Sequence, residues 1–451
     1  MSALYIECLT RSKASILCKR ERRHRQLFCN TVCVARVPPR RRETFNPSTM
    51  MFRTLMLCGC IAMVAVMAED RAPIDKDTRK AVSVFNVFGE KVYRELSRRE
   101  GNIFLSPISV SAIVGMIHLG ARGKTAEEME DVLGLQKFAL NGSTLHEAVR
   151  KLITTLLPLV DQFDLQIANG VFVTDGLQVN VQYRDGLSRF YKAGLYSAPL
   201  KDQPEEAVSD LNHWVKDQTN GKIPVLLERP LPATIPLVML NAVYFRGNWL
   251  HPFRNESTKR NKFYGSSRVN DNVELMYQEG AFIHIDTPQY QAVELPYKGE
   301  DIVMIVILPK DSKDLYRLEQ TISYKDIRDQ LSSVIKQRVK LTLPKFSLNL
   351  GYDMRGPLQD VGLNSMFSPR HANLTGISRF PVIALDTIYH KAIVDVNEEG
   401  TIALATTTGI NRHSSLMNPQ VAEFKADRPF LFIIEDVESN AVLFVGRVSD
   451  L

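Results

Sequence analysis

The spacing of the apolar residues changes once along this chain, from a helical period to a strand period. Between residues 75 and 100, apolar residues recur every three or four positions, at Ala81, Phe85, Phe88, Val92 and Leu96. This spacing predicts an amphipathic helix. Helical patterns follow over residues 109–119, 125–133 and 145–157, and we expect Pro158 to close the last of these helices.

Beyond Leu165 the pattern is that of strands. Residues 302–308 form an unbroken apolar run, which is typical of a strand buried on both faces. Residues 339–343 alternate apolar and polar, as in a strand with one wet face, and residues 430–434 and 441–448 predict a closing hairpin. Because helices come early and strands late without regular alternation, the fold class is expected to be α+β rather than doubly wound α/β. No repeat or Pro/Gly/Ser-rich linker separates the halves, so one domain is expected.

The basic charge of the chain is concentrated at its N-terminus. The first 68 residues hold 12 of the 56 Lys and Arg residues but only 3 of the 50 Asp and Glu residues. The remaining residues carry a net charge of −3 and are therefore mildly acidic. A nucleic-acid partner is not expected for such a surface.

A short apolar segment lies behind this basic stretch. Residues 54–68 carry no charge, follow Arg53 and end in the small residue Ala68. This pattern predicts a secretory signal peptide over residues 50–68 and a secreted, extracellular chain that begins near Glu69. The segment is shorter than the roughly 20 residues that span a bilayer, so no membrane association is expected.

Residues 1–49 do not fit a secretory signal, because such signals stand at the N-terminus. We expect them to be an extension foreign to the native protein, with translation starting at Met50 or Met51. The alternative is that this Arg-rich, acid-poor stretch is a transit peptide or a nucleic-acid-binding arm.

The cysteines and the glycosylation triplets bear on cofactors and modification. All six cysteines lie within the first 60 residues, and no Cys or His pair at ligand spacing follows Cys29 and Cys33. Neither a metal nor another cofactor is therefore expected. Asn141, Asn255 and Asn373 each begin an Asn-x-Ser/Thr triplet and are candidate glycosylation sites.

Two catalytic motifs begin in this sequence but are incomplete. Gly123-Lys124-Thr125 could end a phosphate-binding loop, but His118 stands where the first glycine of that loop is needed. His146-Glu147 could begin a zinc-protease motif, but Arg150 replaces its second histidine. The Gly-x-Ser-x-Gly nucleophile elbow is also missing from the sequence. The chain is therefore not expected to be an enzyme.

One segment near the C-terminus combines a strand period with very small side chains. After Glu398-Glu399-Gly400, small residues occupy every second position: Thr401, Ala403, Ala405, Thr407 and Gly409. The segment then becomes polar up to about residue 420. It could be an exposed loop with one face small enough to enter between existing strands, or a surface hairpin with a long tip.

Here the chain resembles the serpins. The hinge, Glu398-Glu399-Gly400-Thr401, is similar to the start of the serpin reactive-centre loop, and residues 424–432 are similar to the family's C-terminal signature. Further blocks follow in the family's order, at residues 102–109, 119–125, 212–223, 241–249, 294–297, 390–392 and 444–448. Any one of these matches could arise by chance, but the ordered series from about 75 to 451 is specific.

The resemblance implies both a fold and a function. It implies a single serpin domain over residues 69–451, with three β-sheets, about eight or nine helices and an exposed reactive-centre loop at about 398–420. It also implies a monomeric inhibitor of an extracellular serine protease. The protease cleaves the loop, the hinge side inserts into the main sheet, and the protease is trapped covalently.

The resemblance also implies roles for particular residues. Counting from Gly400 places the scissile bond at Ser414-Ser415, which suits an elastase-like protease, or at Arg412-His413 for a trypsin-like protease if the register shifts. The inward positions of the hinge would be Thr401, Ala403 and Ala405. A buried hydrogen-bond cluster is implied for four residues: Ser106, Ser109, Asn241 and His390.

A serpin that does not inhibit, such as a carrier or a storage protein, is the alternative function. Such relatives often have bulky or charged residues at the inward hinge positions. Thr401, Ala403 and Ala405 are small and uncharged, and this favours an inhibitor.

Overall fold

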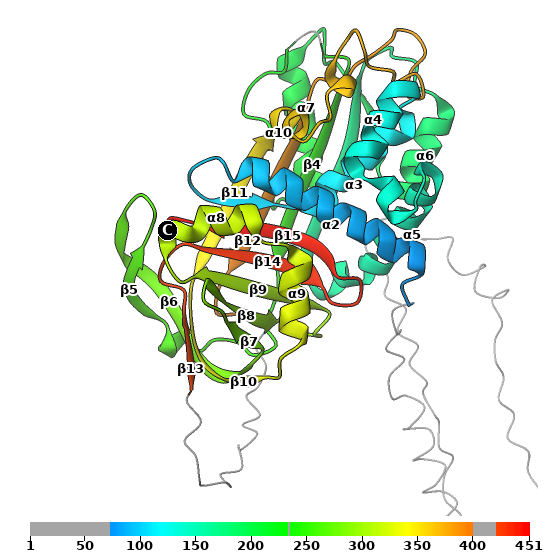
Figure 1. Ribbon diagram of the computed structural model, residues 1–451. Coiled ribbons are helices and arrows are strands. Elements are labelled where there is room, and N and C mark those ends of the chain that lie inside the picture. Colours follow the sequence, from blue (N-terminus) through cyan, green and yellow to red (C-terminus); the bar gives the residue numbers. More distant parts are fainter. Residues whose placement is uncertain (1–72, 233–234, 400–420) are drawn as a thin grey trace, which may run out of the picture. The chain divides into compact units, whose positions relative to one another are not determined.

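The computed structural model describes residues 73–232, 235–399 and 421–451 (Figure 1). The chain divides into two units, Met1–Asp70 and Arg71–Leu451, and every element below belongs to the second. The predicted N-terminal extension, the signal peptide and all six cysteines lie outside the described residues.

The described ranges contain nine α-helices, six of them in the first half of the unit. They are α2 Lys76–Leu96, α3 Pro107–Gly120, α4 Gly123–Leu133, α5 Gly142–Gln162, α6 Val181–Tyr191, α7 Pro204–Gln218, α8 Leu315–Thr321, α9 Tyr324–Ser332 and α10 Arg355–Asp360. Four short 3-10 helices join them: η1 Leu135–Phe138, η2 Asn255–Ser257, η3 Ser312–Asp314 and η4 Ser365–Phe367.

The helices predicted from apolar spacing are present, with one correction. The Asp75 side chain caps α2 by accepting a hydrogen bond from the Thr78 N–H at 2.8 Å, and the apolar stripe of α2 is buried against α3, α5 and β15 (Ala441–Val448). The prediction that Pro158 ends the helix over 145–157 is wrong, because α5 continues to Gln162. A proline inside a helix removes one backbone donor, and a helix packed along its length can continue past it.

The strands form three sheets, as expected for the α+β class. The main sheet has five strands in the order β11 Phe346–Asp353, β12 Ile388–Val396, β4 Leu237–Arg246, β2 Asp164–Thr174 and β3 Gly194–Ala198. The second has six, in the order β1 Ile103–Leu105, β15, β14 Phe430–Asp436, β9 Ile302–Pro309, β8 Tyr290–Pro296 and β7 His284–Asp286. The third has four, in the order β13 Ala422–Lys425, β10 Gln337–Pro344, β6 Val269–Phe282 and β5 Lys259–Tyr264.

Three strand predictions are confirmed in detail. All eight residues of β9 are buried, as the unbroken apolar run predicts. In β10 the alternate residues Val339, Leu341 and Leu343 are buried while Lys340 is exposed. β14 and β15 pair antiparallel as the closing hairpin.

The main sheet lies between two apolar clusters. On one face, residues of β12 and β4 join the large core of the unit, together with α2, α3 and the six-stranded sheet. On the other face, Ala207, Leu211 and Val215 of α7 belong to a second apolar cluster with residues of β2, β4 and β12, including Leu240 and Ile393. Both faces of the sheet are therefore covered along this stretch, and a strand added between β12 and β4 would also be covered.

Candidate functional site

The central feature of the main sheet is a parallel pair of strands, β12 and β4. His390 pairs with Asn241 and Val394 pairs with Phe245. β12 is antiparallel to β11, and β4 is antiparallel to β2. In the β12–β4 pair, each strand has an antiparallel neighbour on its other side, and parallel pairing is slightly less stable per residue than antiparallel pairing.

The chain leaves β12 directly into the predicted hinge. Because β12 ends at Val396, a strand that folded back from Glu398-Glu399 would run antiparallel to β12 and also to β4. Such a strand would replace one parallel pairing by two antiparallel ones. The pairing directions in the sheet are therefore compatible with one more strand at this position.

Glu398 is held in place at the end of this pair. It is 7% exposed, its Oε1 accepts a hydrogen bond from the Thr258 hydroxyl at 2.9 Å, and its Oε2 lies 3.2 Å from Lys345 Nζ. Burial alone raises the pKa of this carboxyl, but a backbone hydrogen bond, Thr258 and Lys345 outweigh burial and lower the pKa. Glu398 is therefore an anchored carboxylate rather than a free surface charge.

The residues on either side of Glu398 are also bonded to the sheet end. The carbonyl oxygen of Asn397 accepts a hydrogen bond from Trp249 Nε1 at 2.9 Å, and the Trp249 ring stacks on Tyr297 with centroids 4.4 Å apart. Glu399 is more exposed, and its Oε2 lies 2.6 Å from an Arg246 nitrogen at the end of β4. The start of the hinge is thus tied to both strands of the parallel pair.

The four residues of the expected buried cluster lie together beneath the middle of this pair. His390 is fully buried on β12, and its Nδ1 is hydrogen bonded to Asn241 Oδ1 on β4. Its Nε2 accepts a hydrogen bond from the Ser106 N–H at 3.2 Å. Asn241 in turn donates to Asn169 Oδ1 on β2 at 2.7 Å, so the network joins three neighbouring strands to the start of α3.

The network requires a neutral histidine. Because Nε2 accepts from a backbone N–H, the proton of the neutral ring is on Nδ1, where it can be donated to Asn241. Burial lowers the pKa of His390 to about 3. The imidazole is therefore uncharged at neutral pH.

The geometry does not form a serine nucleophile. The Ser106 hydroxyl lies 2.8 Å from the carbonyl oxygen of Leu443 and 2.9 Å from the Ser109 hydroxyl, whereas only the backbone N–H of Ser106 reaches His390. A nucleophile needs its hydroxyl on the base. The Ser106 hydroxyl instead joins the start of α3 to β15, and the Ser109 hydroxyl is bonded to it.

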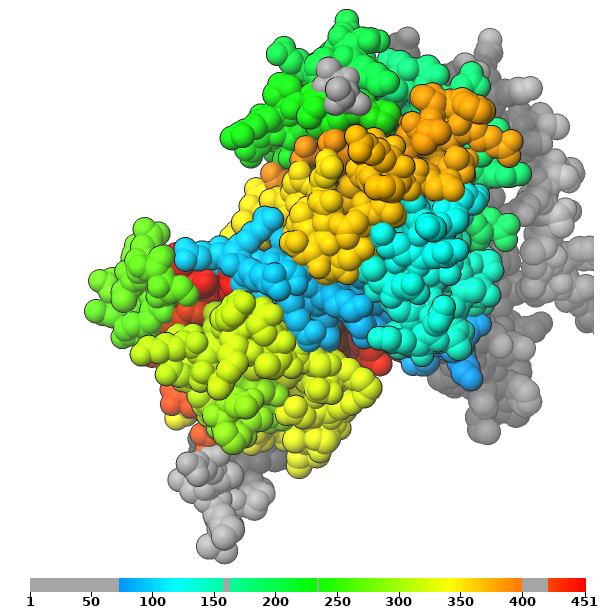
Figure 2. Space-filling model, turned by 45° about the horizontal axis from the view of Figure 1, so that its top comes forward, coloured from blue at the N-terminus to red at the C-terminus, as the bar shows by residue number. Residues whose placement is uncertain are grey.

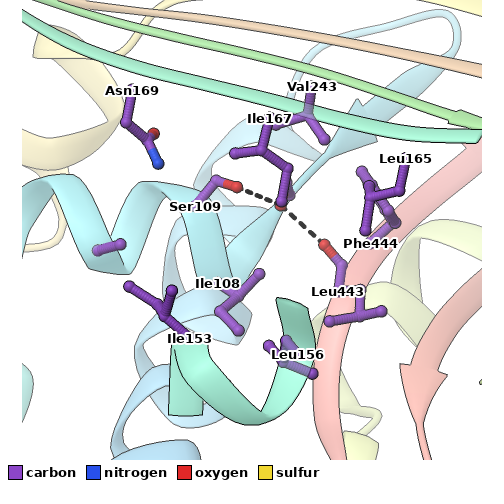
Figure 3. Close-up of a pocket in the computed structure, with 12 residues that line it drawn as sticks. Ile108, Ser109, Ile153, Leu156, Leu165, Ile167, Asn169, Val243, Leu443 and Phe444 are labelled. Carbon is purple, nitrogen blue, oxygen red and sulfur yellow. Dashed lines mark hydrogen bonds between the residues drawn. The ribbon is translucent and has the colours of Figure 1, made fainter. Parts of the chain in front are cut away.

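An apolar cavity of about 100 Å³ adjoins this cluster (Figure 3). The hydrogen-bonded serines line it together with apolar side chains of α3, α5, β2 and β15, including Ile153, Leu165 and Phe444.

The scissile-bond candidates Arg412, His413, Ser414 and Ser415 lie outside the described residues, as do Gly400, Thr401, Ala403 and Ala405 of the hinge. Among the glycosylation candidates, Asn141 and Asn255 are exposed and Asn373 is half-buried. Asn141 caps α5 by accepting from the Thr144 N–H at 2.9 Å. Occupancy of all three sites stays a prediction.

Three residues of the site were missed at the level of sequence: Asn169, Thr258 and Lys345. Asn169 is a polar residue within the otherwise uncharged, mostly apolar stretch 167–173 of β2, which is a usable signal for a polar partner. Thr258 and Lys345 stand in connecting segments, where polar residues are ordinary, and only the fold brings them to Glu398.

The described ranges give no sign of a metal centre or a membrane span. No group of three or more His, Cys, Asp or Glu side chains within them is placed to hold a metal ion. Among the helices that the structure describes, none combines the length and apolarity needed to cross a bilayer.

A family model described as Serpin (serine protease inhibitor) matches residues 83–451. Iripin-2 from Ixodes ricinus is 34% identical over 381 residues, which are 83% of this chain and 95% of that protein. Leukocyte elastase inhibitor from Bos taurus is 34% identical over 382 residues, covering 83% of this chain and 98% of its own length.

Two solved structures are also similar to this chain. Native protease nexin-1 with heparin is 29% identical, with a TM-score of 0.72 and coverage of 82% of this chain and 100% of that chain. Maspin has a TM-score of 0.74 over 84% of this chain and 100% of that chain, and at 24% identity this likeness concerns the fold alone.

Proposed function

Because the chain belongs to the serpin family, a family of protease inhibitors rather than enzymes, we propose that it is a secreted inhibitor that traps serine proteases in an extracellular proteolytic cascade. The observation that carries the proposal is the parallel β12–β4 pair, from which the chain passes directly into the hinge.

The first step is cleavage of the loop by the target protease. The serine hydroxyl of the protease attacks the carbonyl carbon of residue 414, the peptide bond to residue 415 breaks, and the new amine leaves with Ser415. The N-terminal part of the loop remains attached to the protease as an ester. Its connection to β13 is now broken, so it is free to move with the hinge.

The second step is insertion between β12 and β4. A two-residue turn at Glu398-Glu399 places Thr401 opposite Val396 and Ala403 opposite Val394, on the side of the sheet that faces the main core. The small side chains fall on this side, where the network of His390 leaves little room. Ester hydrolysis is then slowed because the protease is dragged along the sheet and its active site is deformed.

In the same register, the two larger loop residues, Ile402 and Leu404, have different neighbours. Ile402 falls opposite Asp395, and Leu404 falls opposite Ile393, which belongs to the apolar cluster under α7. Leu404 therefore gains an apolar environment after insertion. Its size is compatible with inhibition in this register.

The loop sequence supports an elastase-like target, with a trypsin-like protease as the alternative. Ser414 before the scissile bond suits the narrow pocket of an elastase-like protease, and a relative of this chain is a leukocyte elastase inhibitor. Arg412 would suit a trypsin-like protease. The apolar segment at 50–68 supports secretion, and the remaining chain without cysteine is compatible with either redox compartment.

Incubation of residues 69–451 with elastase-like and trypsin-like proteases tests the proposal. A complex that survives SDS, with release of a fragment of residues 415–451, supports an inhibitor cut after Ser414; release of 413–451 moves the bond to Arg412. Cleavage without a complex across a broad panel would contradict inhibition and favour a carrier or storage role. Ala405→Arg is the matched control, because it should be cleaved without forming the complex.

A further inference from the structure

Residues 378–387 form a loop at the end of the β12–β4 pair that lies opposite the hinge. This loop leads into β12 and is held by hydrogen bonds and buried side chains. Ser378 is fully buried, and its hydroxyl lies 3.3 Å from the carbonyl oxygen of Phe380. Further along, Ile383 and Leu385 are buried, and the Leu385 N–H donates to the carbonyl oxygen of Met366 at 3.0 Å. The backbone of this loop is thus fixed on both sides of its tip.

The tip itself presents two large apolar side chains outward. Phe380 is 82% exposed and Val382 is 60% exposed, although buried residues flank them on both sides. Val181, 65% exposed, lies close by, because the N–H of its neighbour Asn180 donates to the carbonyl oxygen of Ile377 at 2.8 Å. In Figure 2 the orange surface of this region stands beside the green segment that leads into β4.

Insertion in this register would carry the protease towards the start of β12, into which this loop leads. With the turn at Glu398-Glu399, Gly409 falls opposite Ile388, the first residue of β12. Five more residues, about 16 Å of extended chain, then lead to Ser414. A protease of roughly 230 residues is about 45 Å across. A protease esterified at Ser414 would therefore be held within reach of the surface around the start of β12.

We propose that Phe380 and Val382 form a landing surface for the trapped protease and prolong the life of the covalent complex. The inference rests on the proposed inhibitory function. Its occupant is a serine protease whose packing has been disturbed by translocation, which exposes apolar side chains that a folded protease keeps inside. Two apolar side chains held on a fixed backbone are complementary to such a surface, and their contact disfavours return of the protease to its active form.

The step that this contact slows is hydrolysis of the ester. Water attacks the carbonyl carbon of Ser414, the bond to the protease oxygen breaks, and the products are a carboxylic acid on the cleaved chain and a free protease hydroxyl. Residues that keep the protease distorted slow this step without taking part in it. They act after cleavage and insertion, so they should not alter how quickly the complex forms.

The test compares complex lifetimes in the chain spanning residues 69–451. The double variant Phe380→Ser/Val382→Ser should form the SDS-stable complex at the unaltered rate and stoichiometry, but release active protease roughly 10-fold faster. Phe380→Leu should keep most of the lifetime, since it keeps an apolar side chain. Tyr316→Ser removes another exposed aromatic side chain, from α8, and should change nothing.

The outcomes separate the two proposals. Equal release rates for the double variant and the unaltered chain, with normal complex formation, would overturn the landing surface and leave inhibition standing. Absence of any complex with the unaltered chain would overturn both. The thermal midpoints of the free variants should match that of the unaltered chain, because exposed side chains contribute little to folding.

Discussion

Replacing His390 by alanine should open the main sheet. The substitution leaves two buried groups without partners, the Ser106 N–H and Asn241 Oδ1. Each unsatisfied buried group costs about 1–3 kcal/mol, so the loss is about 2–6 kcal/mol. Even about 2 kcal/mol raises the population of an opened sheet roughly 30-fold. Because the lost bonds join β12, β4 and α3, the opening falls between the two parallel strands.

The expected consequence is loop insertion between molecules. An opened β12–β4 pair can accept the loop of a neighbour as an added strand. Heating His390→Ala below its unfolding midpoint, followed by size-exclusion chromatography, should convert monomer into oligomers faster than for the unaltered chain. The thermal unfolding midpoint of His390→Ala should also be lower than that of the unaltered chain.

Two further variants test the size of this loss of stability, one with a smaller expected loss and one with none. Asn169→Ala orphans only the side-chain amide of Asn241, so its loss should be about half as large, about 1–3 kcal/mol. His371→Ala removes an exposed histidine that lies 3.0 Å from the Ser368 hydroxyl and should behave like the unaltered chain. Unchanged monomer content and an unchanged midpoint for His390→Ala would refute the reasoning.

Three other changes test separate parts of the account. Glu398→Lys places a second cation beside Lys345 and should lower the thermal midpoint by several degrees, and adding Lys345→Glu should restore it. Burial lowers the pKa of His146 to about 3, whereas the unfolded residue titrates near 6.5. Stability should therefore be full above about pH 6.5 and fall on acidification towards pH 3. His146→Gln should remove on the order of 2 kcal/mol of that loss at pH 5 in denaturant titrations, and an unaltered pH dependence would count against it. Ala403→Glu should bury a charge on insertion and cut the yield of covalent complex at least tenfold, while Ile402→Gln should not.

Most of the helices and strands can be predicted from the sequence, because they follow the spacing of apolar residues along the chain. The stripe of α2, the buried run of β9 and the closing hairpin of β14 and β15 all follow from residues close together in the chain. The exception is Pro158, where α5 continues to Gln162 although a proline locally favours the end of a helix.

The geometry of the site needs the fold, because its partners are far apart in sequence. His390 and Asn241 are separated by 149 positions and Glu398 and Thr258 by 140. No periodicity relates such pairs. The resemblance to serpins named the cluster of four, but only the structure shows that Asn169 extends it to β2, and that the Ser106 backbone rather than its hydroxyl meets the imidazole.

Insertion of the cleaved loop into the main sheet is the central claim, and the thermal midpoint of the cleaved chain tests it most directly. A metalloprotease that cuts between residues 400 and 420 forms no acyl-enzyme, since it activates water, and so yields cleaved protein without trapping. If the hinge inserts between β12 and β4, the midpoint should rise by about 10 °C or more, because one parallel pairing becomes two antiparallel ones. A midpoint equal to or below that of the intact chain would contradict the account.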